Sequence, residues 1–177
     1  MKRLLVIGNI SELQKIRLTK QLVSWEIITM SSSSFSLPLK WKELYSKFKH
    51  YNDENPINEI SKMIRFVIAL GFLSENNGIV IDSNIRLKKP IPNNLLSQKT
   101  ILIDEDFLVF INSENTYNVY DDLYNEIIEG METYNWMCDP KSFFKYVKSF
   151  INFLPKNTVE KINNNNELSN NTIFISL

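Results

Sequence analysis

The chain has 177 residues and no net formal charge, and it is 44% hydrophobic and 23% charged. This length suits one domain, residues 1–177, with a sizeable core. The balance of charge gives no general attraction to nucleic acid or to a membrane, although a local basic patch is compatible with it. The single cysteine, Cys138, excludes an internal disulfide and favours a reducing, cytoplasmic location.

The N-terminal sequence "MKRLLVIGNI" begins with basic residues, as a secretion signal does. Its apolar run is too short for such a signal, and charged residues follow it too soon. No apolar run approaches the ~20 residues that a membrane-spanning helix needs. We therefore expect a soluble protein without a membrane span.

The first 31 residues predict a strand, a helix and a second strand. "RLLVIGN" is typical of a buried strand that ends at a glycine turn. The helix "SELQKIRLTKQLVSW" begins at Ser11, a favourable N-cap residue. Its apolar residues are expected mostly on one helical face: Leu13, Ile16, Leu18, Leu22 and Val23. "WEIITMS" predicts the second strand, and this order favours a parallel α/β unit.

A serine-rich loop at residues 31–36 leads into two helical segments. "WKELYSKFKHY" has apolar residues at helical spacing, and the helix ends before Pro56. Residues 57–73, "INEISKMIRFVIALGFL", form the longest helical pattern in the chain. Its buried stripe is predicted to contain Ile57, Ile60, Ile64, Val67 and Ile68. The buried strand "GIVID", residues 78–82, follows.

The second half is predicted to contain strands and then helices. "KTILID" and "FLVFIN" are two strands, or one bent strand, around the acidic residues 104–106. We interpret these acids as a solvated hairpin tip, with a metal-binding role as the alternative. Residues 121–131 and 139–155 predict helices, the second with Asp139 as N-cap. Residues 162–171 are asparagine-rich and predict a flexible loop, and "TIFISL" predicts a final strand at a sheet edge.

Polar residues follow two of the expected strands, where open α/β sheets bind their ligands. Gly8 and Asn9 follow the first strand, and Asp82 ends the strand at residues 78–82. Asn84 lies two residues beyond Asp82, so in an extended segment both side chains point the same way. Their oxygen atoms are the kind that Mg²⁺ and Mn²⁺ prefer. A turn capped by Asp82 is the simpler alternative, and the spacing alone favours it.

The segment from Ser61 to Ile91 resembles the sugar-binding region of GT-A glycosyltransferases with a DXD motif. These include mannosyltransferases and capsular polysaccharide transferases. Ser61 and Arg65, with the aromatic residue after it, match the family's helix. Gly78 and Asp82 match its strand, and "LKKPI" matches the tail that follows.

The resemblance implies an α/β fold: a single Rossmann-like GT-A-type domain with a mixed, mostly parallel sheet flanked by helices. It implies a UDP- or GDP-linked nucleotide-diphospho-sugar as donor, bound by Gly8, Asn9, Ser61, Arg65, Gly78 and Asp82. It implies Mg²⁺ or Mn²⁺ bridging the two phosphates, held by Asp82 and Asn84. The sugar would pass to a hydroxyl acceptor, either a glycan or a small molecule. A modified DNA base is a further acceptor. Lysines alternate with aromatic residues in "KSFFKYVKSF", which is compatible with contacts to nucleic acid. The favoured interpretation of this segment is an amphipathic helix with its lysines in water and its aromatic residues in the core.

The chain also departs from the family's pattern. Lys62 replaces the acid that follows the serine, and Asn84 replaces the second acid of the DXD motif. The only histidine, His50, precedes the motif, whereas the family commonly has a later histidine or carboxylate as a metal ligand. These departures support an alternative from another class, a catalytically inactive GT-A-like protein that binds a ligand or a partner.

Overall fold

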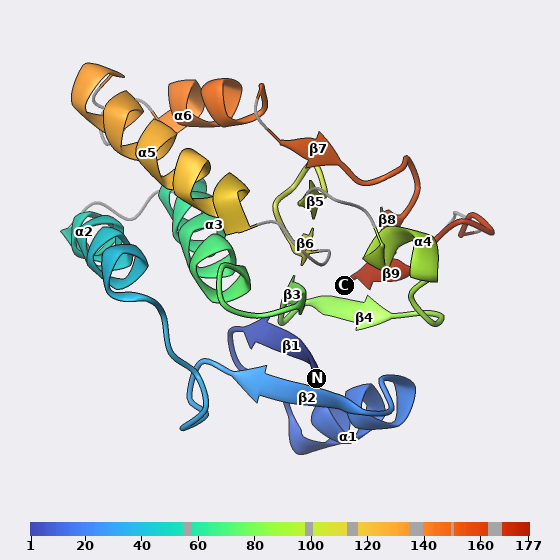
Figure 1. Ribbon diagram of the computed structural model, residues 1–177. Helices are drawn as coiled ribbons and strands as arrows, with labels where there is room; N and C mark the ends of the chain where they lie inside the picture. The colour runs from blue at the N-terminus through green and yellow to red at the C-terminus, as the bar shows by residue number, and fades with distance from the viewer. Residues whose placement is uncertain (55–57, 98–100, 113–116, 135–139, 150, 163–167) are drawn as a thin grey trace.

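The computed structural model describes residues 1–54, 58–97, 101–112, 117–134, 140–149, 151–162 and 168–177 (Figure 1). In this part of the chain the larger sheet has six strands in the order β2-β1-β3-β6-β5-β7. Their bounds are β2 Trp25–Thr29, β1 Lys2–Ile7, β3 Gly78–Asp82, β6 Val109–Ile111, β5 Leu102–Ile103 and β7 Asn152–Phe153. The pairs β1–β2, β1–β3 and β5–β7 are parallel, whereas β3–β6 and β5–β6 are antiparallel. The sheet is therefore mixed.

Parallel strands at the centre of this sheet require crossover connections. Helix α1 (Glu12–Gln21) connects β1 to β2, and α2 (Leu39–Glu54) with α3 (Asn58–Leu73) connects β2 to β3. Strand β3 is buried along its whole length, and so are the last four residues of β1. Such continuous burial is typical of parallel strands that are covered on both faces.

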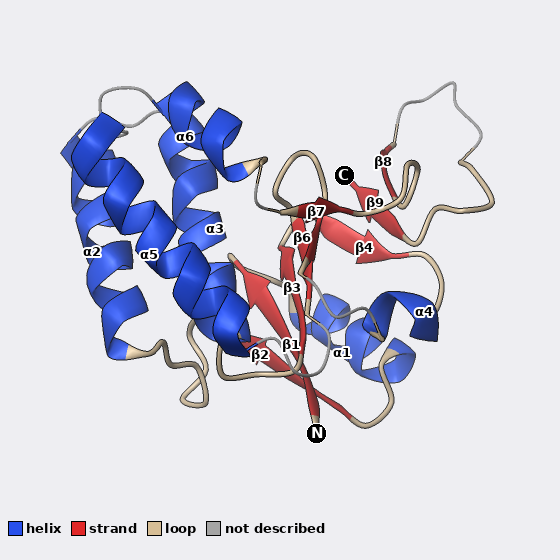
Figure 2. Cartoon of the chain, turned by 45° about the horizontal axis from the view of Figure 1, so that its top comes forward, coloured by secondary structure: helices blue, strands red, loops and turns tan. Residues whose placement is uncertain are grey.

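The helices cover both faces of the larger sheet. Helices α2, α3, α5 (Tyr117–Tyr134) and α6 (Pro140–Val147) pack on one face, and α1 and α4 (Asn93–Leu96) lie on the other (Figure 2). Alternate residues of a strand face opposite sides. Accordingly Leu5 and Val80 belong to the core under α2 and α3, whereas Leu4 and Ile79 belong to the core under α1. The prediction of an α/β fold with a mixed sheet flanked by helices is confirmed.

A smaller sheet follows directly from the end of β3. It contains β4 (Ile85–Leu87), β9 (Phe174–Ser176) and β8 (Val159–Lys161) in the order β4-β9-β8. The turn at residues 83–84 therefore joins the two sheets. The prediction that the last strand lies at a sheet edge was wrong, because β9 pairs on both sides. Strands β4 and β8 were not predicted, since three residues are too few to show a periodic pattern.

The predicted helix at 57–73 is confirmed as α3. Ile60, Val67 and Ile68 are buried as expected, Ile64 is only partly buried, and Ile57 lies outside the described residues. The helix predicted at 139–155 was too long. Helix α6 ends at Val147, and residues 152–153 form β7, which pairs in parallel with β5. Pairing with a distant strand decided the structure of this segment. Asp139, the predicted N-cap, also lies outside the described residues.

Helix α1 begins as predicted, but its buried face differs from the prediction. The Oγ of Ser11 accepts a hydrogen bond from the backbone N–H of Gln14 at 3.2 Å. Leu18 and Leu22 are buried. The other three predicted stripe residues are exposed: Leu13 at 58%, Ile16 at 48% and Val23 at 76%. The predicted apolar face is therefore wrong at three of its five residues. The helix buries Gln14 instead.

Residues 163–167 of the predicted loop at 162–171 lie outside the described residues, and the described remainder lies outside helices and strands. Among the described helices, none combines the length and the apolar character that crossing a membrane demands. The single domain over residues 1–177 stays a prediction.

Candidate functional site

Three segments that are distant in sequence meet at one edge of the larger sheet. The backbone N–H of Asp82 donates to the carbonyl of Leu108 at 2.8 Å, and that of Ser83 donates to the carbonyl of Ile7 at 2.8 Å. The loop after β1, the turn after β3 and the β5–β6 turn therefore lie side by side. The connection from β1 to β2 covers one face of the sheet and that from β2 to β3 covers the other. The carboxyl ends of β1 and β3 are thus a topological switch point, where such folds bind ligands.

The carboxylate of Asp82 is buried, with 8% of the residue exposed. Its Oδ1 accepts a hydrogen bond from the backbone N–H of Asn84 at 3.0 Å. Its Oδ2 accepts one from Nη1 of Arg65, on α3, at 3.1 Å. The simpler prediction, a turn capped by Asp82, is therefore confirmed. The ion pair joins Arg65 and Asp82, each of which was predicted to bind the donor.

The side chains of Asp82 and Asn84 do not fit a Mg²⁺ or Mn²⁺ site as they lie. A guanidinium group already neutralises the carboxylate of Asp82, and Asn84 contributes no charge. Among the residues that the structure describes, no group of three or more His, Cys, Asp or Glu side chains is placed to hold a metal ion. A hard cation is usually held by several oxygen ligands, so we derive no step through a metal.

Arg65 extends the site along α3. Its side chain is 19% exposed, and its Nε is buried without a hydrogen-bond partner in the described part of the chain. Ser61, which is half-buried, lies one helical turn before Arg65 and therefore on the same side of the helix. That turn carries Ser61 about 6 Å further along the helix axis, at roughly 1.5 Å per residue.

Gly8 and Asn9 contribute to a polar hollow at the carboxyl ends of β1 and β2. Gly8 has a φ of +100°, and a Cβ there would lie 2.6 Å from Oγ of Ser83. Glycine therefore allows the loop after β1 to approach the turn after β3 closely. The hollow has a volume of about 300 Å³. Its lining also includes Lys15, Thr29, Ser31 and Ser32.

Gly78 lies at the other end of β3, about 13 Å from Asp82 at roughly 3.3 Å per residue. The structure therefore does not bring it together with the other predicted donor-binding residues. Its φ is +157°, and a Cβ would lie 1.8 Å from the backbone oxygen of Arg3. Close approach of β1 explains this glycine without a ligand.

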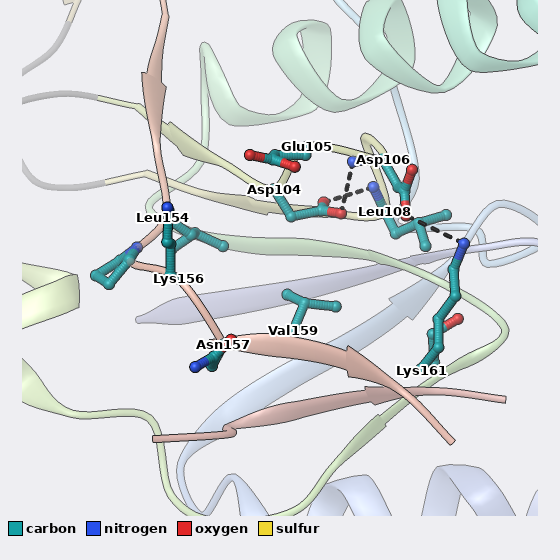
Figure 3. Close-up of a pocket in the computed structure, with 11 residues that line it drawn as sticks. Asp104, Glu105, Asp106, Leu108, Leu154, Lys156, Asn157, Val159 and Lys161 are labelled. Carbon is teal, nitrogen blue, oxygen red and sulfur yellow. Dashed lines mark hydrogen bonds and ion pairs between the residues drawn. The ribbon is translucent and has the colours of Figure 1, made fainter. Parts of the chain in front are cut away.

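The acidic residues 104–106 form the tip of the β5–β6 hairpin, as predicted, but Asp104 is not solvated. It is 7% exposed. Its Oδ1 accepts a hydrogen bond from the backbone N–H of Leu108 at 2.6 Å, and its Oδ2 accepts one from that of Asp106 at 3.1 Å (Figure 3). The backbone N–H of Val109 also donates to Oδ1 at 2.6 Å. Burial raises the pKa of Asp104, and these bonds oppose the rise. Asp104 thus stabilises the turn.

A hollow of about 430 Å³ beside this turn was not predicted from the sequence. The turn forms one side and residues 154–157 form another (Figure 3). Nζ of Lys161 pairs with Oδ2 of Asp106 at 3.3 Å across it. No local sequence pattern indicates this hollow, because its lining comes from segments about 50 residues apart in the chain.

The basic and aromatic residues of α6 separate as an amphipathic helix predicts. Phe143 is fully buried, whereas Lys141, Lys145 and Lys148 are exposed. These lysines line a hollow of about 380 Å³ together with Lys62 of α3, and two acids, Glu59 and Glu105, line it as well.

Six of the seven predicted site residues thus lie on the elements around the switch point: Gly8, Asn9, Ser61, Arg65, Asp82 and Asn84. No model of a known protein family matches this chain, and no curated protein sequence matches it either. The case for a function therefore depends on the site's geometry.

Proposed function

We propose that this chain binds a nucleotide-diphospho-sugar at the carboxyl edge of its larger sheet and transfers the sugar to a hydroxyl acceptor, with a Rossmann-like GT-A fold. The observation that carries the proposal is the Arg65–Asp82 ion pair at the switch point between β1 and β3. The ion pair fixes a guanidinium group at the edge where α/β proteins bind their ligands.

The hollow beside Gly8 suits the polar part of a nucleoside, because Asn9, Ser31 and Ser32 provide hydrogen-bonding groups there. Arg65 suits the diphosphate. Asp82 orients its guanidinium through Nη1 and leaves Nη2 to donate to phosphate oxygens, whereas Nε is buried. An N–H donor fixed at this position would stabilise the negative charge that develops on the departing nucleoside diphosphate.

Binding of Mg²⁺ or Mn²⁺ by Asp82 and Asn84 stays a prediction. It requires the carboxylate of Asp82 to leave Arg65, and their contact at 3.1 Å counts against it. The acceptor, whether a glycan, a small molecule or a modified DNA base, also stays a prediction.

The second candidate is a GT-A-like protein that binds a ligand or a partner without catalysis. The burial of Asp82 and the neutral side chain of Asn84 favour it, since neither supplies an accessible charge to a metal. Both candidates use the same site, so only turnover separates them.

The test is calorimetric titration with UDP, UDP-glucose and GDP-mannose, each with and without Mn²⁺. Two variants address the site: Arg65→Gln removes the charge, and Ser31→Trp fills the polar hollow from an exposed position. Lys42→Gln, on the exposed face of α2, is the matched control. We expect both site variants to weaken binding by about tenfold or more: Arg65→Gln loses roughly one charge-assisted hydrogen bond, and Ser31→Trp excludes the ligand from the hollow.

Donor hydrolysis then separates the candidates. Slow release of sugar that disappears in Arg65→Gln supports the transferase, and binding without release supports the non-catalytic protein. Equal affinities in all variants, or no affinity for any nucleotide, would contradict both.

A further inference from the structure

A basic hollow of about 510 Å³ lies between α1 and β4, on a different side of α1 from the polar hollow described above. Residues Leu13, Gln14, Arg17 and Lys20 of α1 line it, together with Arg86 of β4. Glu12 and Lys15 of the same helix line the polar hollow. The 3.6-residue period of a helix places these two sets on different faces.

The charge in this hollow has one sign. Arg17, Lys20 and Arg86 line it, and no carboxylate does. Within the described part of the chain, none of the three lies within 4 Å of an acidic group. The hollow near α6 and the hollow in Figure 3 differ from this one in charge, because acidic residues line both of them as well as basic ones. Three unpaired cations around one concave surface concentrate a positive potential there.

Arg86 is held in a defined position. Its Nη1 donates to the carbonyl of Ser83 at 2.7 Å and to that of Ile85 at 3.1 Å. The carbonyl of Ser83 also accepts a hydrogen bond from Nε2 of Gln14 at 3.1 Å, which joins α1 to the turn after β3. An arginine held in this way loses little further freedom when it binds an anion.

Part of the remaining wall of the hollow is apolar, although Ser11, Gln14 and Gln21 also line it. Leu13, Leu18 and Leu87 line it, and Leu13 is 58% exposed although the helical pattern predicted its burial. A small inorganic anion would leave this wall in water. A ligand that carries an apolar group beside its charge would cover it.

We propose that this hollow binds an organic phosphate, with the phosphate held by Arg17, Lys20 and Arg86 and the apolar substituent on Leu13 and Leu87. Phosphate suits the site because arginine donates to two of its oxygens at once. The ligand is either a soluble phosphate ester or the headgroup of an anionic lipid. This proposal does not depend on the nucleotide-sugar function.

The test uses calorimetry without metal, with hexyl phosphate and inorganic phosphate as probes, and sedimentation with phosphatidylcholine vesicles that do or do not contain phosphatidylglycerol. The variant Arg17→Gln/Lys20→Gln removes two exposed charges. Its matched control is Lys42→Gln/Lys47→Gln, which removes two exposed charges on α2. Leu13→Ser tests the apolar wall.

We expect hexyl phosphate to bind about tenfold more tightly than inorganic phosphate, because part of its chain leaves water. The Arg17/Lys20 variant should lose about tenfold or more for both probes, whereas the Lys42/Lys47 control should stay within about twofold. Leu13→Ser should weaken only hexyl phosphate. If the protein sediments with vesicles that contain phosphatidylglycerol but not with those that lack it, the ligand is a lipid headgroup. If it sediments with neither, the ligand is a soluble ester.

Three outcomes would overturn the proposal: no binding of hexyl phosphate, equal losses in the Arg17/Lys20 variant and the control, or equal affinity for hexyl and inorganic phosphate. Because the phosphate probes can also meet Arg65 at the donor site, the loss in the Arg17/Lys20 variant is what assigns their binding to this hollow.

Discussion

Substitution of Arg65 by Met is expected to destabilise the protein more than substitution of Asp82 by Asn. Methionine keeps much of the arginine's apolar volume, but it leaves the carboxylate of Asp82 buried with one remaining hydrogen bond, from Asn84. Removing one partner of a buried ion pair costs about 3–5 kcal/mol. Because the two side chains are still 19% and 10% exposed, we expect the lower end, about 3 kcal/mol.

Asp82→Asn keeps the shape of the side chain, but its one oxygen accepts from only one of the two donors, Asn84 or Arg65, and its NH2 group meets the other. The expected loss is that of a charge-assisted hydrogen bond, about 1.5–3 kcal/mol. The double variant Arg65→Met/Asp82→Asn buries no unpaired carboxylate, so it should be more stable than the sum of the two losses predicts. A coupling of about 1–2 kcal/mol is expected, within the range for residues in contact.

Urea unfolding followed by tryptophan fluorescence measures all four proteins, and a constant m-value shows that the denatured state is unchanged. A free energy of unfolding of about 5–15 kcal/mol, as is typical of native proteins, exceeds each of these single losses. Additive effects of the two substitutions, with a coupling below about 0.5 kcal/mol, would show that Arg65 and Asp82 do not form the pair seen in the structure.

Two further predictions concern stability alone. Gly78→Ala should cost more than about 3 kcal/mol in urea unfolding, because its Cβ would lie 1.8 Å from the backbone oxygen of Arg3; an unchanged midpoint would refute the close approach of β1. Asp104→Asn should change how stability depends on pH: burial raises the pKa of Asp104 above its ordinary 3.8, so the folded state holds this proton more tightly than the unfolded chain does. The stability of the wild type relative to the variant should therefore be greatest below about pH 3.8 and should fall as the pH rises through the folded-state pKa. A difference in urea midpoint that instead increases in favour of the wild type over that interval would contradict this prediction.

Local patterns predicted the first half of the fold well. The strand before Gly8, the N-cap at Ser11, the helix at 57–73 and the strand that ends at Asp82 are all present. Each depends on a signal confined to a few neighbouring residues: a short apolar run, a capping side chain or helical spacing. Strand β7 within the predicted last helix shows the limit, because its structure comes from pairing with β5, about 50 residues away.

The candidate site was predictable only in part, for the same reason. The sequence places an acid at the end of β3, but it does not say what faces that acid. Arg65 reaches Asp82 because α3 packs against β3, and this contact turns an expected metal ligand into the partner of an arginine.

The sequence by itself determined an α/β chain whose buried strand ends on Asp82, because backbone propensities and the alternation of apolar residues act over short distances. The tertiary structure decided that Asp82 pairs with Arg65, that Asp104 is buried, and that Leu13 faces a basic hollow. Burial and charge pairing depend on which surfaces pack together, and residues far apart in the chain determine that packing.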